Sequence, residues 1–285
     1  MAPEPIFSGN FIESLLKLTR FGNLIIIGLA QYFTAGFLIG THTLTDPKLF
    51  LLSLSTISIA AAGYIINDYY DIKIDYINKP DRVVIGKSIT RRYAILFHVM
   101  LSGFGILIGL YLSWRIAAVN VLSVFLLWLY SNNLKRLPFV GNLTVAFLTG
   151  LSILIVGMFY RNVNALIVIY ACFAFFMTLV REIIKDIEDV KGDDTFGCRT
   201  LPIVWGIRKT KMLIYIILAV FSVSVLVLDH FYMDVPFHYY LIFLFVPLLW
   251  LLFRIIRADM KSDFSLISTF CKIIMLFGIL SMAFA

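Results

Sequence analysis

Long apolar stretches separated by short polar segments occupy most of the chain. Stretches of about twenty apolar residues predict membrane-spanning helices. The pattern predicts nine such spans, at residues 21–40, 48–66, 93–112, 115–131, 140–160, 163–182, 211–229, 238–256 and 264–284. We therefore expect an all-α, polytopic membrane protein that forms one transmembrane domain over residues 1–285.

The composition excludes an ordinary soluble domain. The chain is 61% hydrophobic and 14% charged, with a mean hydropathy of +0.93. Soluble proteins are about half apolar and a quarter charged. The three cysteines (Cys172, Cys198 and Cys271) lie far apart and form no CxxC pair, so we expect neither a disulfide framework nor a zinc site.

Basic residues fall almost entirely on one side of the predicted spans. Twenty of the 24 lysines and arginines lie on the side of the N-terminus, whereas only Lys48, Arg115 and Arg161 lie on the other. Cytoplasmic loops carry such an excess, so we expect the N-terminus and the long polar loops in the cytoplasm, with the protein in the cell (plasma) membrane. The net charge of +7 then reflects topology and attraction to anionic lipid headgroups, and it does not indicate nucleic acid binding.

A first cluster of acidic residues directly follows the second span. Asn67, Asp71 and Asp75 stand four residues apart, with Asp68 beside Asn67. On a continuing helix this spacing places the three side chains on one face. Neighbouring carboxylates repel one another unless a cation lies among them. The row therefore favours a hard cation such as Mg²⁺, which prefers one or two carboxylates together with substrate phosphate oxygens.

A second cluster repeats this arrangement after the sixth span. Asp186, Asp189 and Asp193 are separated by three and four residues, so they again share a helix face. Ten of the 17 acidic residues lie in these two clusters, which we place in cytoplasmic motif loops at residues 67–92 and 181–210. Two facing rows would hold metal ions with an anionic ligand between them, and a diphosphate neutralised by nearby Arg or Lys suits that arrangement.

These motifs resemble those of a known family. The pattern Asn67-Asp68-x-x-Asp71-x-x-x-Asp75 is similar to the first aspartate-rich motif of the UbiA-type intramembrane prenyltransferases, and Asp186-x-x-Asp189-x-x-x-Asp193 resembles the second. The similarity extends over nearly the whole chain. Supporting positions are Arg20, Asn23, the 78–82 loop, the 130–136 segment and the 200–202 segment.

The resemblance implies a fold of nine helices around a central cavity and a Mg²⁺-dependent transfer of a prenyl group from an allylic diphosphate. It also implies roles for particular residues. The expected metal ligands are Asn67, Asp71, Asp75, Asp189 and Asp193. The expected catalytic residues are Asp68, Asp71, Asp75, Asp186, Asp189 and Tyr130, and the expected substrate-binding residues are Arg20, Asn23, Arg82, Lys135 and Lys185.

The acceptor is left open between two classes. The 181–189 and 130–136 segments are most similar to the branch that makes digeranylgeranylglyceryl phosphate, which transfers geranylgeranyl to a lipid-phosphate acceptor. The basic 73–92 segment suits an acceptor phosphate, but it suits the carboxylate of an aromatic acceptor of quinone, chlorophyll or haem side-chain biosynthesis equally well. The oligomeric state is not predicted.

Two functions from other classes remain as alternatives. A transporter would also place acids at a pore mouth, although spans two and six carry none at midplane. A phosphatidyltransferase of the CDP-alcohol type also uses aspartates and a metal, although neither acidic segment contains its Asp-Gly and Ala-Arg signature. Lys272 lies inside the ninth span, where a charge is costly. It either serves function or is accommodated by snorkelling or pairing with a buried polar group.

Overall fold

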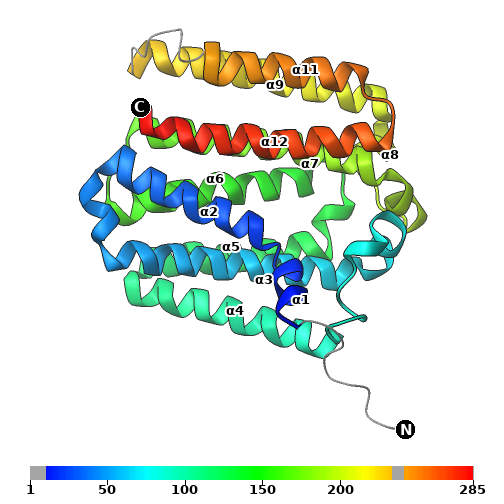
Figure 1. Ribbon diagram of the computed structural model, residues 1–285, viewed down its shortest axis with the longest axis horizontal. Helices are drawn as coiled ribbons and strands as arrows, with labels where there is room; N and C mark the ends of the chain where they lie inside the picture. The colour runs from blue at the N-terminus through cyan, green and yellow to red at the C-terminus, as the bar shows by residue number, and fades with distance from the viewer. Residues whose placement is uncertain (1–10, 233–240, 285) are drawn as a thin grey trace.

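The computed structural model describes residues 11–232 and 241–284 and consists almost entirely of helices (Figure 1). The α-helices are α1 (Phe11–Leu18), α2 (Phe21–Phe33), α3 (Pro47–Asn78), α4 (Arg91–Leu112), α5 (Trp114–Asn132), α6 (Val140–Tyr160), α7 (Ala165–Thr195), α8 (Leu201–Trp205), α9 (Ile207–Tyr232), α11 (Val246–Arg257) and α12 (Lys261–Ser281). Shorter π- or 3₁₀-helical pieces are η1 (Thr34–Ile39), η2 (Thr41–Thr45), η3 (Pro80–Arg82), η4 (Leu134–Arg136), η5 (Leu241–Phe245) and η6 (Met282–Phe284). No strand occurs among these residues beyond an isolated bridge between Ile85 and Ile89.

Eight of the nine predicted spans correspond to helices that are long and apolar enough to cross a membrane. The remaining predicted span, 238–256, begins outside the described residues. Its described part forms η5 and α11, which follow one another directly. The all-α, polytopic fold class is therefore confirmed, and the chain is an integral membrane protein.

The two acidic segments differ from the expected loops. Helix α3 continues through its acidic row to Asn78, and α7 continues through its row to Thr195. The expectation that each row lies on a continuing helix is thus confirmed, while the loop assignment of residues 67–78 and 181–195 is wrong. Both extensions are stabilised by contact with each other, because Asn78 Nδ2 donates to the Asp189 carbonyl at 3.1 Å.

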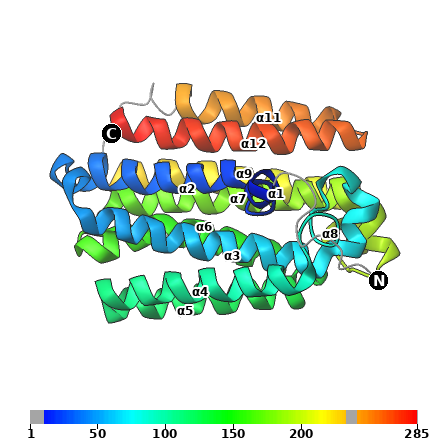
Figure 2. The ribbon, with the colours of Figure 1, turned by 60° about the horizontal axis from the view of Figure 1, so that its bottom comes forward.

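The long helices run side by side, and the ends of α3 and α7 lie at the same end of the bundle as α8 (Figures 1 and 2). A large apolar core joins α7, α9, α11 and α12, with Ile183, Phe221 and Cys271 fully or almost fully buried in it. The acidic rows therefore extend from a packed apolar frame into the polar end of the molecule.

Helix α4 shows the packing expected in lipid, with small residues inside and large residues outside. Gly105 and Gly109 are buried, whereas Leu107 and Tyr111 are 65% and 77% exposed. Small residues let membrane helices approach closely. A Cβ atom on Gly105 would lie 2.6 Å from Ile59 Cγ1 and 3.0 Å from a backbone oxygen of α3. This contact fixes α4 against the helix that carries the first acidic row.

Candidate active site

A single cavity of about 910 Å³ extends from the acidic ends of α3 and α7 into the apolar interior. Its walls come from α2, α3, α5, α6, α7 and α12. Every site residue expected from the sequence lines this cavity. They are Arg20, Asn23, Asn67, Asp68, Asp71, Asp75, Arg82, Tyr130, Lys135, Lys185, Asp186, Asp189 and Asp193.

The acidic row of α3 is paired with cations from two other segments. Arg20 Nη2 lies 2.7 Å from Asp68 Oδ1, and Lys135 Nζ lies 2.5 Å from Asp71 Oδ1. Lys135 belongs to η4, in the connection between α5 and α6. Asp75 also lines the cavity but makes no side-chain ion pair within the described chain. The last carboxylate of this row is thus available to a ligand.

Arg20 is positioned by an unusual turn between α1 and α2. Its backbone has a φ of 52°, in the left-handed region, and its guanidinium lies 5.0 Å from the centre of the Tyr64 ring. Burial disfavours the charged form, but its neighbours Asp68, Tyr64 and Asp75 together outweigh this cost and raise the pKa of Arg20 above its ordinary value. The cavity wall therefore keeps a permanent positive charge here.

The acidic row of α7 has one cation partner and one amide partner. Lys79 Nζ lies 2.6 Å from Asp189 Oδ2, and Asn142 Nδ2 donates to Asp186 Oδ2 at 2.9 Å. Asp193 lines the cavity and makes no side-chain ion pair in residues 11–232 and 241–284. Lys79 directly follows α3 in the sequence, yet its charge neutralises the opposite row.

Asn78 holds the two rows at a fixed separation. Besides its bond to the Asp189 carbonyl, its Oδ1 accepts a hydrogen bond from the Gly192 amide at 2.9 Å. The close approach requires glycine, since a Cβ on Gly192 would lie 2.5 Å from the Asn78 side chain. Lys261, at the start of α12, donates to the Asn78 carbonyl at 2.9 Å. The ends of three helices are therefore joined at one asparagine.

The oxygen atoms at the mouth fit a hard divalent cation. Asn67 Oδ1 and Asp189 Oδ1 are buried and have no hydrogen-bond partner in the described chain, although such atoms are normally satisfied. Within the same residues, no three His, Cys, Asp or Glu side chains converge into a complete metal cage. Mg²⁺ rarely uses such a cage and prefers a few protein oxygens plus substrate phosphates, so the residues present suit it.

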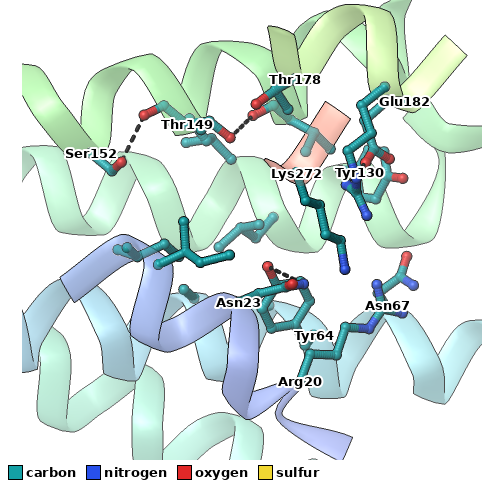
Figure 3. Close-up of a pocket in the computed structure, with 18 of the residues that line it drawn as sticks. Arg20, Asn23, Tyr64, Asn67, Tyr130, Thr149, Ser152, Thr178, Glu182 and Lys272 are labelled. Atoms are coloured by element: carbon teal, nitrogen blue, oxygen red, sulfur yellow. Dashed lines mark hydrogen bonds and ion pairs between the residues drawn. The ribbon is translucent and has the colours of Figure 1, made fainter. Parts of the chain in front are cut away.

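Deeper in the cavity lie polar residues that were not assigned roles from the sequence, among them Tyr64, Arg181 and Glu182. Asn23 Nδ2 donates to the Tyr64 hydroxyl at 3.3 Å, and Tyr130 lies beside Glu182 (Figure 3). Glu182 accepts 2.8 Å contacts from both Arg181 and Lys185. A charged residue at the end of a predicted span, such as Glu182, can be recognised from the sequence as a candidate functional residue. A tyrosine in an apolar run, such as Tyr64, cannot.

The family model of the UbiA prenyltransferases matches residues 29–277. The chain belongs to the UbiA prenyltransferase family. This confirms the resemblance seen at the two aspartate motifs, and it identifies the chain as a prenyltransferase rather than a transporter or a phosphatidyltransferase.

Relatives within the UbiA family point to one branch. The chain is 33% identical over 277 residues to digeranylgeranylglyceryl phosphate synthase of Saccharolobus solfataricus, covering 95% of each chain. It is 35% identical over 238 residues to the enzyme of that name from Methanosphaera stadtmanae, covering 83% of this chain and 87% of the relative.

Solved structures of UbiA proteins share the fold. A digeranylgeranylglyceryl phosphate synthase structure aligns with a TM-score of 0.72 and 26% identity, covering 96% of this chain and 98% of that chain. A UbiA homologue from Archaeoglobus fulgidus bound to GPP and Mg²⁺ aligns with a TM-score of 0.70 at 14% identity, covering 95% of this chain and all of that chain. That second similarity concerns the fold alone.

Proposed function

We propose that this UbiA-family enzyme transfers a geranylgeranyl group from its diphosphate to the free hydroxyl of geranylgeranylglyceryl phosphate, forming an ether lipid. The observation that carries the proposal is the cavity. It joins a polar mouth lined by two carboxylate rows to an apolar interior lined by residues such as Ile59, Leu148 and Phe173. A diphosphate and an isoprenoid tail need these two environments side by side.

The sequence relatives decide which acceptor is proposed. The two relatives reported above are named digeranylgeranylglyceryl phosphate synthase and match over most of their length. The basic residues that line the cavity suit an acceptor that carries its own phosphate. An aromatic acceptor is retained as an outcome of the test.

The polar mouth would bind the donor diphosphate. Lys79 and Lys135, each already beside a carboxylate, would neutralise its oxygens, and Arg20 and Arg82 would add positive charge from the same wall. As the donor C1–O bond breaks, negative charge accumulates on the diphosphate, and these cations stabilise it. The acceptor oxygen then bonds to C1 and loses its proton, so ether, diphosphate and a proton are the products.

Asn67, Asp71, Asp75, Asp189 and Asp193 would hold Mg²⁺. When bound, this ion supplies Lewis-acid stabilisation of the departing diphosphate. The apolar interior has a separate task, which is to house the prenyl chain and to keep water away from the electron-poor allylic carbon. We place the protein in the cell membrane, with the mouth of the cavity and the N-terminus on the cytoplasmic side, since the basic residues concentrate on that side.

The decisive experiment is a transfer assay with the purified protein, labelled geranylgeranyl diphosphate and Mg²⁺. Geranylgeranylglyceryl phosphate and 4-hydroxybenzoate are offered in separate reactions, each with an EDTA control. We expect an EDTA-sensitive ether product with the lipid phosphate only. Product with 4-hydroxybenzoate only would keep the prenyltransferase and move the acceptor to the aromatic class.

A further inference from the structure

Two basic residues outside the aspartate rows, Arg181 and Lys272, lie at the same depth in the cavity as Asn67, the innermost member of the α3 row. Asn67, Arg181 and Lys272 are each 11 residues from a member of the Asn78, Gly192 and Lys261 junction that joins α3, α7 and α12. A helix rises 1.5 Å per residue, so each lies about 16 Å along its helix from that junction. The two basic residues therefore lie level with the inner end of the α3 row, where the polar mouth meets the apolar interior.

Lys272 is a charge inside a predicted span for which the described chain offers no counter-charge. It belongs to the span formed by α12, and its side chain points into the cavity between Tyr64 and Asn67 (Figure 3). It makes no ion pair or hydrogen bond within residues 11–232 and 241–284. An amino group held inside a membrane protein is costly without a counter-charge, so an anionic ligand is its natural partner.

Arg181 shows a second unsatisfied donor at the same depth. Its Nη1 contacts Glu182 at 2.8 Å, but its Nε is buried with no partner among the described residues. Thr178, one turn deeper on α7, also has a buried hydroxyl oxygen without a partner. Both residues line the cavity. Buried polar groups are rarely left unpaired, and a phosphate offers the acceptor oxygens that an N–H and an O–H require.

The charge of this region is not balanced. Arg181, Lys185 and Lys272 bring three positive charges, and Glu182 is the carboxylate that Arg181 and Lys185 share. In the aspartate rows, Asp189 and Asp71 have cation partners in Lys79 and Lys135, while further carboxylates of these rows have none within the described chain. The cavity therefore offers two different sites for anions. At the carboxylate rows an anion would bind together with a metal ion, and at Arg181, Lys185 and Lys272 it would bind directly to positive charges.

We infer that Lys272 and Arg181 form a phosphate subsite for the acceptor, distinct from the diphosphate site at the aspartate rows. This inference rests on the proposed function, which supplies an acceptor that carries a phosphate close to its reacting hydroxyl. Binding that phosphate at the inner end of the α3 row places the hydroxyl beside the donor C1 and selects phosphorylated lipids over neutral ones.

The test compares Lys272→Gln with the wild type in steady-state transfer. Two acceptors are used, geranylgeranylglyceryl phosphate and its dephosphorylated form, geranylgeranylglycerol. The variant is expected to raise the KM for the phosphorylated acceptor about tenfold or more, as loss of a charge-assisted contact does. The KM for the donor and the rate with the neutral acceptor should stay within about twofold of the wild type. Lys272→Arg should restore most of the affinity, and Lys209→Gln, at an exposed lysine of α9, is the matched control.

A binding measurement separates this inference from the proposed function. The dissociation constant of geranylgeranylglyceryl phosphate is measured without donor or metal, and Lys272→Gln should weaken it about tenfold. Equal affinity in variant and wild type would overturn the subsite, as would a rise in the donor KM instead of the acceptor KM. Absence of ether product from the wild type would contradict the proposed function, while the binding comparison still decides the subsite.

Discussion

The two acidic rows look alike in the sequence but have different surroundings in the structure. On α3, Asp68 and Asp71 each face a cation from a distant segment. On α7, Asp189 faces Lys79, while Asp186 is held by the neutral amide of Asn142. The α3 row is thus mainly balanced by charge, and the α7 row is partly positioned by a hydrogen bond.

This difference shows how the mouth of the cavity is assembled. Lys79 is attached to α3 but neutralises α7, and Asn78 beside it binds the backbone of α7 at two places. The end of α3 therefore supplies both the first row and the contacts that orient the second. The rows are two halves of one site, and their contributions can be separated by substitution.

The largest expected effect comes from removing one carboxylate in either row. Asp71→Asn and Asp189→Asn preserve side-chain size but remove a charged group from the proposed Mg²⁺ and diphosphate site. We expect each to lower kcat about a thousandfold or more, because such groups stabilise charge in the transition state. The measurement is the transfer assay with Mg²⁺ at a saturating concentration.

Asp194→Asn is the matched control for this pair, because Asp194 lies on the same helix, next to Asp193, and is exposed. It should retain activity within about twofold of the wild type. Unequal losses of kcat in Asp71→Asn and Asp189→Asn would show which row contributes more to catalysis. Near wild-type turnover from either Asp71→Asn or Asp189→Asn would contradict the two-row site altogether.

The second prediction breaks the link between the rows. Asn78→Ala removes the hydrogen bonds to the Asp189 carbonyl and the Gly192 amide. The expected cost is about 2–4 kcal/mol of unfolding free energy, from two lost bonds at about 1–2 kcal/mol each. Thermal unfolding in detergent measures it, and an unchanged midpoint would show that the two helix ends hold their position without Asn78.

The third prediction compares two glycines on α4, which packs against the helix of the first row. Gly105→Ala places a methyl group against Ile59 and an α3 carbonyl, whereas Gly103 has nothing within 4 Å of its Cβ position. We expect Gly105→Ala to destabilise the protein by about 1–3 kcal/mol and Gly103→Ala to be neutral or slightly stabilising, as measured by thermal unfolding. Equal midpoints would mean that α3 can shift away from α4.

The sequence predicted the parts of this architecture that depend on local spacing. The four-residue steps from Asn67 to Asp75 place oxygen atoms on one helix face, and α3 does continue through them. The pairing of Lys79 with α7 was not predictable, since it depends on how two helix ends 110 positions apart meet. Lys272 was recognisable as a costly charge, but its depth beside Asn67 required the register of α3 against α12.

The smallest expected effects come from substituting, one at a time, the two lysines that lie beside the rows. Lys79→Gln and Lys135→Gln each remove a cation beside a carboxylate, at Asp189 and Asp71 respectively. Since we propose that each lysine also binds the donor, the KM for geranylgeranyl diphosphate should rise about tenfold, equivalent to about 1.4 kcal/mol. The Mg²⁺ concentration for half-maximal activity should fall, because the carboxylate loses a competing cation.

Lys191→Gln provides the control for both lysines, because this lysine lies on α7 but is exposed. If the rows contribute equally to diphosphate binding, the two variants should raise the donor KM by similar factors and the double variant by about their product. A rise confined to Lys135→Gln would show that the diphosphate lies against the α3 row. In that case Lys79 would act mainly on the position of Asp189, in keeping with the hydrogen-bonded character of the α7 row.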